Sequence, residues 1–270
     1  MRGAVLIFSR ILCLLASYLI VDGSGAYAQG FAALVSPPRF ELSVKAGERL
    51  REVLEISNAG AQAARFRVKT ADWALDKNAA VAFDDSLQPG SCRPWVAIER
   101  RDITVPAGGK YRYRFEVAPP AEAVAGECRF ALLIEGDDQS VRASDNVSFP
   151  VSGRIGVIIY VSVGNTEPKL EVVETRVGKV NGELVPLVIV RNTGNAHGRL
   201  TGFLSGTDAA GKNLEFTPAT LPILPGETRT ISLTVNSERD EPVKIAYPIT
   251  IRGDLEWGDK TMPFEQRFEP

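Results

Sequence analysis

The sequence predicts an all-β protein made of two immunoglobulin-like β-sandwich domains in tandem. Three observations support this class. Apolar and polar residues alternate with period two along much of the chain, and clusters of Gly, Pro, Asn and Asp interrupt the alternation about every ten residues, as in a β-sandwich. One strand–turn–strand pattern also occurs twice. No segment carries apolar residues at helical spacing over three turns.

The alternating segments are spread over the whole chain after its N-terminal segment. Each has an apolar residue at every second position, which places those side chains on one face of a strand. The predicted strands therefore have one face for a core and one for solvent. They are 50–57, 64–70, 110–117, 127–135, 185–190, 229–235 and 244–251.

The repeat is carried by two pairs of segments. Residues 53–75, VLEISNAGAQAARFRVKTADWAL, resemble 187–209, LVIVRNTGNAHGRLTGFLSGTDA. Residues 102–117 and 221–235 share a Pro and Gly turn that leads into an alternating strand. Two copies of a seven-strand unit would explain this order.

Gly, Asn and Pro interrupt two strand patterns in the segment GNTEPK, 164–169. We therefore predict a first domain over 29–165 and a second over 166–270. Asn58 and Asn192 occupy matching places in the repeat, and we expect both at tight turns, with left-handed backbone and side chains bonded to nearby amides.

Residues 1–28 are predicted to be a secretory signal. Arg2 gives a basic start, an apolar stretch follows, and Ala26-Tyr27-Ala28 forms a small-x-small cleavage site. The alternative is an uncleaved membrane anchor, but Arg10 interrupts the apolar stretch, and a charge there costs a few kcal/mol on insertion. After cleavage we expect no membrane insertion and an exported, periplasmic protein.

Two cysteines, Cys92 and Cys128, remain after that cleavage. An exported compartment permits a disulfide, and an isolated pair fits one. Two free thiols and a zinc site are the alternatives; a single histidine and no CxxC motif argue against zinc. The formal net charge of −2, without blocks of like charge, gives no sign of a nucleic acid or anionic membrane partner.

Residues typical of catalysis are sparse. His197 is the only histidine and has no Ser or Cys nearby in sequence, so we expect a solvated turn residue rather than a general base. We interpret the acidic pairs 84–85 and 137–138 as loop residues. We expect Trp73 and Trp95 to pack in the core or at an interface. No nucleophile, zinc-protease or phosphate-loop motif occurs. We expect neither an enzyme nor a cofactor or metal site.

One apolar strand is unusually long. In ASDNVSFPVSGRIGVIIYVSVG, 143–164, alternation runs through Val147, Phe149 and Val151 and resumes after Gly153. The whole stretch is more than twice the usual strand length of five or six residues. Such a strand either belongs to the core of its own domain or serves a partner.

The order of the first-domain motifs resembles that of the periplasmic chaperones of the chaperone–usher pilus pathway, the PapD-like family. The resemblance covers most of the chain after the signal and is clearest in the first domain. It rests on these segments and on the long strand after them: VSPPRFELSVKAGE (35–48), VLEISNAG (53–60), FRVKTADW (66–73), VPAGGKYRYRFEV (105–117) and PPAEAVAGECRFALLIE (119–135).

This resemblance implies a function for the long strand. In the family, the last strand of the first domain donates alternating apolar side chains to a pilus subunit that lacks a strand, which is donor-strand complementation. Here Val147, Phe149 and Val151 would be the donated side chains. The implied partners are a pilus or fimbrial subunit and an outer-membrane usher.

The family also anchors the subunit's terminal carboxylate with two basic residues. Arg39 matches the first of them by its place after VSPP. The second is a lysine where this chain has Gly156, so we expect Arg154, two residues away on the same strand face, to replace it.

Simpler interpretations remain open for these residues. The three apolar side chains could form the domain's own core face, and the two arginines could be surface charges. An exported immunoglobulin-like adhesion or cell-wall-binding module is the alternative function, and a subunit or assembly factor that accepts a strand is a further one. Seven predicted strands in each domain argue against the last.

Overall fold

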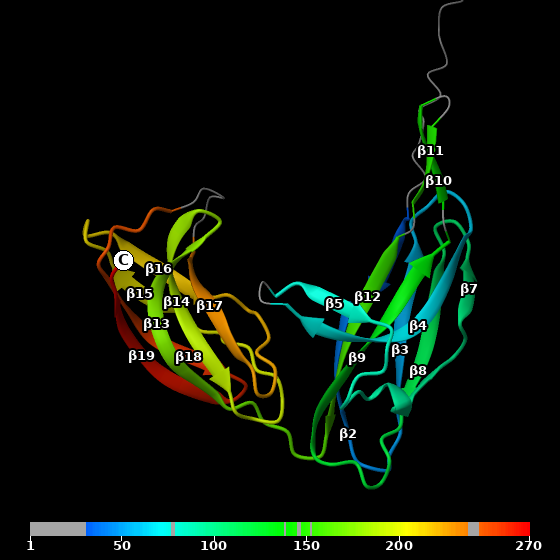
Figure 1. The fold of residues 1–270 in the computed structure, drawn as a ribbon, viewed down its shortest axis with the longest axis horizontal. Coiled ribbons are helices and arrows are strands. Elements are labelled where there is room, and N and C mark those ends of the chain that lie inside the picture. Colours follow the sequence, from blue (N-terminus) through cyan, green and yellow to red (C-terminus); the bar gives the residue numbers. More distant parts are fainter. Residues whose placement is uncertain (1–30, 77–78, 138, 145–146, 152, 237–242) are drawn as a thin grey trace, which may run out of the picture.

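The computed structural model describes residues 31–270, except 77–78, 138, 145–146, 152 and 237–242. Within 139–151 it describes the strand backbones and not the side chains. The predicted signal, 1–28, therefore lies outside the described residues. In the described part the chain is all-β, with one 3-10 turn, η1 (Arg93–Trp95), which confirms the predicted class. Two β units are joined at one end and set at an angle (Figure 1).

The first unit packs two sheets face to face. A four-stranded sheet has the order β1 (Ala33–Ser36), β3 (Leu50–Asn58), β8 (Lys110–Val117), β6 (Val96–Ile98). A six-stranded sheet has the order β2 (Arg39–Val44), β12 (Arg154–Val163), β9 (Gly126–Gly136), β4 (Ala64–Leu75), β5 (Val81–Asp84), and β7 (Asp102–Val105) also pairs with β4. Alternate apolar residues of both sheets meet in one core.

The predicted opening strand, 35–48, divides between the two sheets. β1 pairs with β3, whereas β2 runs parallel to β12. Pro37 and Pro38 separate them, and neither has an N–H to donate to a ladder. This division adds one strand to the seven expected for the first unit.

The second unit is a single seven-stranded sheet folded onto itself. Its order is β13 (Leu170–Val180), β14 (Glu183–Asn192), β17 (Thr228–Val235), β16 (Asn213–Pro218), β15 (Leu204–Thr207), β18 (Ile249–Trp257), β19 (Lys260–Phe268). The first and last strands of this path approach each other, and Thr175 on β13 bonds Gln266 on β19 at 3.4 Å. The exact boundary at 165/166 stays a prediction; β12 ends at Val163 and β13 begins at Leu170.

The two asparagines of the repeat have the same role in the two units. Each ends a strand, accepts the N–H two residues on and donates to the carbonyl four residues on: Gly60 and Gln62 for Asn58, Gly194 and Ala196 for Asn192. The expected left-handed backbone is wrong, because neither asparagine is among the described non-glycine residues with positive φ. The buried amide, not a special backbone, holds each turn.

The long predicted strand is two strands. β11 (Val147–Val151) pairs antiparallel with β10 (Gln139–Ser144) in a two-stranded ribbon, and β12 belongs to the six-stranded sheet. The ribbon projects from the end of the first unit, away from both sheets (Figure 1). Val157, Ile159, Val161 and Val163 of β12 are buried in the first core.

Candidate functional site

The six-stranded sheet has a second face, opposite the core, which we call its outer face. Alternation on β2 sends Phe40, Leu42 and Val44 into the core, so Arg39 and Glu41 lie on the outer face. On β12 the outer face receives the even-numbered residues, beginning with Arg154. Part of this face is apolar and is covered by Leu224 of the second unit, which packs in one cluster with Trp73 and Tyr160.

The three apolar residues predicted to bind a partner lie on β11. In the ribbon Val151 is opposite Gln139, Phe149 opposite Val141 and Val147 opposite Ser144. Their side chains are outside the described part of the structure. In the described residues β11 pairs with β10 alone, so its other edge has no strand beside it.

Arg39 is the first residue of β2 and lies opposite Ile158 of β12. Its Nε is 3.0 Å from Oε1 of Glu41, and both side chains are about half exposed. An exposed ion pair of this kind contributes about 0–1 kcal/mol. The guanidinium therefore stays accessible to a second carboxylate.

Arg154 is the first residue of β12 and is also half exposed. Its guanidinium lies 5.5 Å from the centroid of the Phe83 ring and 3.8 Å from Glu135. Both arginines are on the outer face, but four strand residues separate Arg154 from the level of Arg39, roughly 13 Å along β12. The structure does not bring them into contact with a common group.

Gly156, where the resembled family has its lysine, lies beneath an aromatic ring. A Cβ at this position would overlap the tip of the Phe83 side chain, which reaches over from β5. Only glycine leaves room for that ring. The space of a side chain at 156 is therefore taken by Phe83, and Arg154 lies against the same ring.

Lys69 is a further cation near Arg154 that the sequence reasoning missed. Its Nζ is 3.0 Å from Asp85 and 3.1 Å from Glu135, the carboxylate that also pairs with Arg154. The hydrogen bond that Lys69 donates to Asp85 raises the pKa of Lys69 above its ordinary value, and Glu135 adds to this. Lys69 is thus charged at neutral pH. No spacing in the sequence relates 69 to 154, because the two residues meet only across the sheet.

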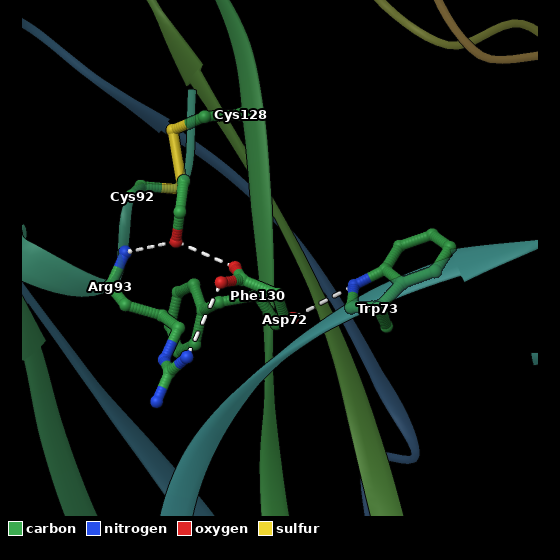
Figure 2. The surroundings of a disulfide bond; sticks show 7 residues. Asp72, Trp73, Cys92, Arg93, Cys128 and Phe130 are labelled. Atoms are coloured by element: carbon green, nitrogen blue, oxygen red, sulfur yellow. Dashed lines mark hydrogen bonds and ion pairs between the residues drawn. A yellow bond between two sulfur atoms is a disulfide. The ribbon is translucent and has the colours of Figure 1, made fainter. Parts of the chain in front are cut away.

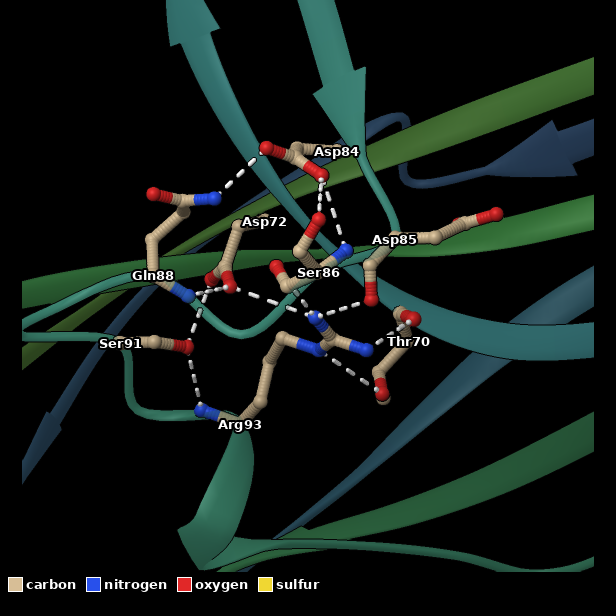
Figure 3. Close-up of polar contacts among 8 residues, drawn as sticks. All are labelled: Thr70, Asp72, Asp84, Asp85, Ser86, Gln88, Ser91 and Arg93. Atoms are coloured by element: carbon tan, nitrogen blue, oxygen red, sulfur yellow. Dashed lines mark hydrogen bonds and ion pairs between the residues drawn. The ribbon is translucent and has the colours of Figure 1, made fainter.

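The segment that carries Phe83 is held by a buried polar network. Arg93 donates to the carbonyls of Thr70, Asp85 and Ser86 and pairs with Asp72 at 3.3 Å (Figure 3). Asp72 also accepts from Ser91 and from the N–H of Gln88. These contacts fix the loop between β5 and η1, and with it the position of Phe83.

The predicted disulfide is present beside this network. Cys92 and Cys128 are bonded, with Cα atoms 5.7 Å apart, within the usual range for a disulfide (Figure 2). The bond ties the loop that precedes η1 to β9. Trp73 is buried and donates its indole N–H to the Phe130 carbonyl at 3.0 Å, and Trp95 packs against the first core, as predicted for both.

The prediction for His197 is wrong. Its side chain is only 10% exposed, its Nδ1 lies 2.7 Å from Glu127, and its ring stacks on Tyr160 with centroids 3.9 Å apart. The Asn-x-Gly loop of the second unit packs against the first unit, and this burial could not be read from the loop's polar sequence. Desolvation raises the pKa of Tyr160, so its hydroxyl stays neutral where it accepts from Arg199.

The described residues contain no group of three or more His, Cys, Asp or Glu side chains that could hold a metal ion. They likewise include no helix with the length and hydrophobicity needed to cross a membrane.

No protein-family model matches the sequence, and neither does any curated protein. Among solved structures, the chain is similar to the class 5 fimbriae chaperone CfaA, with a TM-score of 0.49, 12% identity, and coverage of 88% of this chain and 99% of that one. It is also similar to the YadV chaperone (TM-score 0.47, 9% identity, coverage 87% and 98%). A third is the CsuC-CsuE chaperone-tip adhesion subunit pre-assembly complex of Acinetobacter baumannii (TM-score 0.45, 13% identity, coverage 88% and 100%).

Proposed function

We propose that this chain is a periplasmic chaperone that binds incomplete pilus or fimbrial subunits by donor-strand complementation through β11. One observation carries the proposal: β11 lies in a ribbon outside the sandwich and pairs, in the described residues, on one edge only. A strand with a free edge can add to the sheet of another chain. The ordered motifs of the sequence support the same function.

Such binding would complete the fold of the subunit, because β11 would take the place of its missing strand. A subunit that lacks a strand exposes an apolar groove and a row of unpaired backbone N–H and C=O groups. An alternating strand supplies both partners for the backbone and side chains for the groove. Burial of each of these three side chains, Val147, Phe149 and Val151, would contribute about 1.5–3 kcal/mol. Pro150 lacks a donor, which an edge strand tolerates better than a central one.

The outer face would hold the subunit's terminal carboxylate. Arg39 is half exposed and pairs with a surface carboxylate, Glu41, so its guanidinium can also donate to a bidentate carboxylate partner. The ring of Phe83 covers Gly156, the usual lysine position, and Arg154 lies two residues before it against the same ring. Arg154 would contribute a second positive charge, at a different level of β12 from Arg39. In this proposal Arg39 is the main anchor, because it matches the first basic residue of the resembled family by its place after VSPP, whereas Arg154 lies two residues from the usual lysine position.

The proposed compartment follows from the predicted signal, 1–28, and agrees with a disulfide, which persists in oxidising compartments. An outer-membrane usher would then take over the subunit. The proposal includes neither catalysis nor a cofactor.

Phe149→Asp is expected to reduce the recovery of a bound subunit at least tenfold. The change removes an apolar group worth about 1.5–3 kcal/mol and places a charge in the groove, and each 1.4 kcal/mol is a tenfold change in affinity. The measurement is co-purification from periplasm with pilin subunits cloned from the same genome.

Phe203→Asp is the matched control for that variant. Phe203 is 84% exposed and lies in the second unit, so the same substitution there should leave recovery unchanged. Equal recovery with native chain and Phe149→Asp would contradict strand donation. Equal loss with both variants would show a general effect of added charge and would also count against it.

Arg39→Glu is expected to weaken subunit binding about tenfold, because the guanidinium that would donate to the subunit's carboxylate is replaced by a carboxylate that repels it. The dissociation constant is measured with the same purified subunit. Arg176→Glu is the control: Arg176 is equally exposed and also pairs with a glutamate two residues away, Glu174. An unchanged constant for Arg39→Glu would remove the anchor and leave strand donation standing.

A further inference from the structure

The ribbon joins the sandwich through two glycines. β9 ends at Gly136, and β12 begins at Arg154, one residue after Gly153. The N–H of Gly136 donates to the Gly153 carbonyl at 3.0 Å, between the last pair of the sheet, Glu135 with Arg154, and the ribbon. We call this pair of glycines the root of the ribbon. Glycine has the widest backbone freedom of any residue, so such a root would be loose by itself.

The side chain of Phe31 covers this root. A Cβ at Gly136 would lie 2.6 Å from Cδ2 of Phe31, and a Cβ at Gly153 would overlap the same ring more severely. Any other residue at either position would therefore push the ring away. The ring of Phe31 can occupy this position only because both residues beneath it are glycines.

Phe31 also contacts the first core. Its ring meets that of Phe66 edge to face, with centroids 6.0 Å apart and an interplanar angle of 87°. Phe66 is 2% exposed and belongs to the buried core cluster. An edge-to-face pair contributes about 0.5–1.5 kcal/mol beyond its buried area. Phe31 thus connects the root of the ribbon to a rigid part of the sandwich.

We propose that Phe31 is a positioning residue that fixes the direction in which the ribbon leaves the first unit. Its consequence for binding rests on the proposed function, since the ribbon carries β11. A strand that must enter a partner's groove binds more tightly when its orientation is set in advance. Phe31 follows the predicted cleavage site by three residues, so it would remain in the processed chain.

The test is the variant Phe31→Ala, with two readouts on the isolated protein. Amide hydrogen exchange at Gly136 and Ile155, and cleavage by a protease between 137 and 153, should both become about tenfold faster. Gly153→Ala, which expels the ring from the other side, should give the same change, and Phe31→Leu should restore part of the protection. Leu34→Ala is the control, because Leu34 is close in sequence and 62% exposed.

Unchanged exchange and cleavage in Phe31→Ala would overturn the inference. Equally faster exchange at a central core amide such as Leu54 would show a general loss of stability and would overturn it too. Subunit recovery is measured separately and should fall severalfold with Phe31→Ala. If the native chain recovers no subunit, the proposed function fails, while the exchange and cleavage results still decide the role of Phe31.

Discussion

The double variant Cys92→Ala/Cys128→Ala is expected to lose about 4 kcal/mol of unfolding free energy in the first unit. The disulfide closes a loop with a sequence separation of 36 residues, and the loop-entropy relation gives about this value for that length. Alanine is chosen because Cys92 is fully buried, where a serine hydroxyl would add a desolvation cost of its own. Denaturant unfolding of the native chain, with its disulfide intact, and of the variant measures the difference.

The native chain under reducing conditions is the control for this variant. Reduction should lower its unfolding midpoint toward that of the alanine variant and should leave the variant itself unchanged. A native midpoint that does not respond to reduction would contradict the stabilising role. Because the bond holds the loop that leads to Phe83, the variant should also expose that loop to proteolysis.

Asn192→Ala is expected to lower the unfolding free energy of the second unit by about 3–5 kcal/mol. The side chain is fully buried and makes four hydrogen bonds, to the carbonyls of Ala196 and Ile223 and from the N–H groups of Lys169 and Gly194. Each buried group left without a partner costs about 1–3 kcal/mol, and water entering the cavity would recover part of the total.

Calorimetry tests this effect, with a fall of more than about 10 °C expected in the transition of the second unit. Asn213→Ala is the control in the same unit, because Asn213 is exposed and its side chain accepts a surface hydrogen bond from the hydroxyl of Thr207. It should change the free energy by less than about 0.5 kcal/mol. A similar small change at Asn192 would contradict the role of the buried amide.

Local patterns in the sequence were sufficient for the fold class. Alternation with period two marked the strands, and the repeat placed Asn58 and Asn192 in equivalent turns, where both amides make the same bonds. The pairing of the two cysteines followed from their number. Each of these inferences uses only the chemistry of neighbouring residues or of a residue type.

The candidate site was predicted less completely. The sequence pointed to Arg39 on the first strand and to Arg154 on the last strand of the first domain, and both lie on the outer face, but at separate levels of the sheet. The sequence showed that Gly156 stands where the resembled family has a lysine, but it did not show why. The structure gives the reason, because the ring of Phe83 occupies the space of a side chain at 156. The sequence also indicated a solvated His197, although the other unit buries it.

The sequence by itself determined that this protein is made of strands, that it repeats a turn built on an asparagine, and that its two cysteines can pair. Only the tertiary structure decided where the long alternating segment stops belonging to the sandwich and becomes a ribbon. Alternation continues across 151–155 and does not mark that point. There the ring of Phe31 lies against Gly136 and Gly153, which are more than 100 residues from Phe31 in sequence. Period-two patterning reports which face a side chain takes, whereas packing between distant segments determines what covers that face.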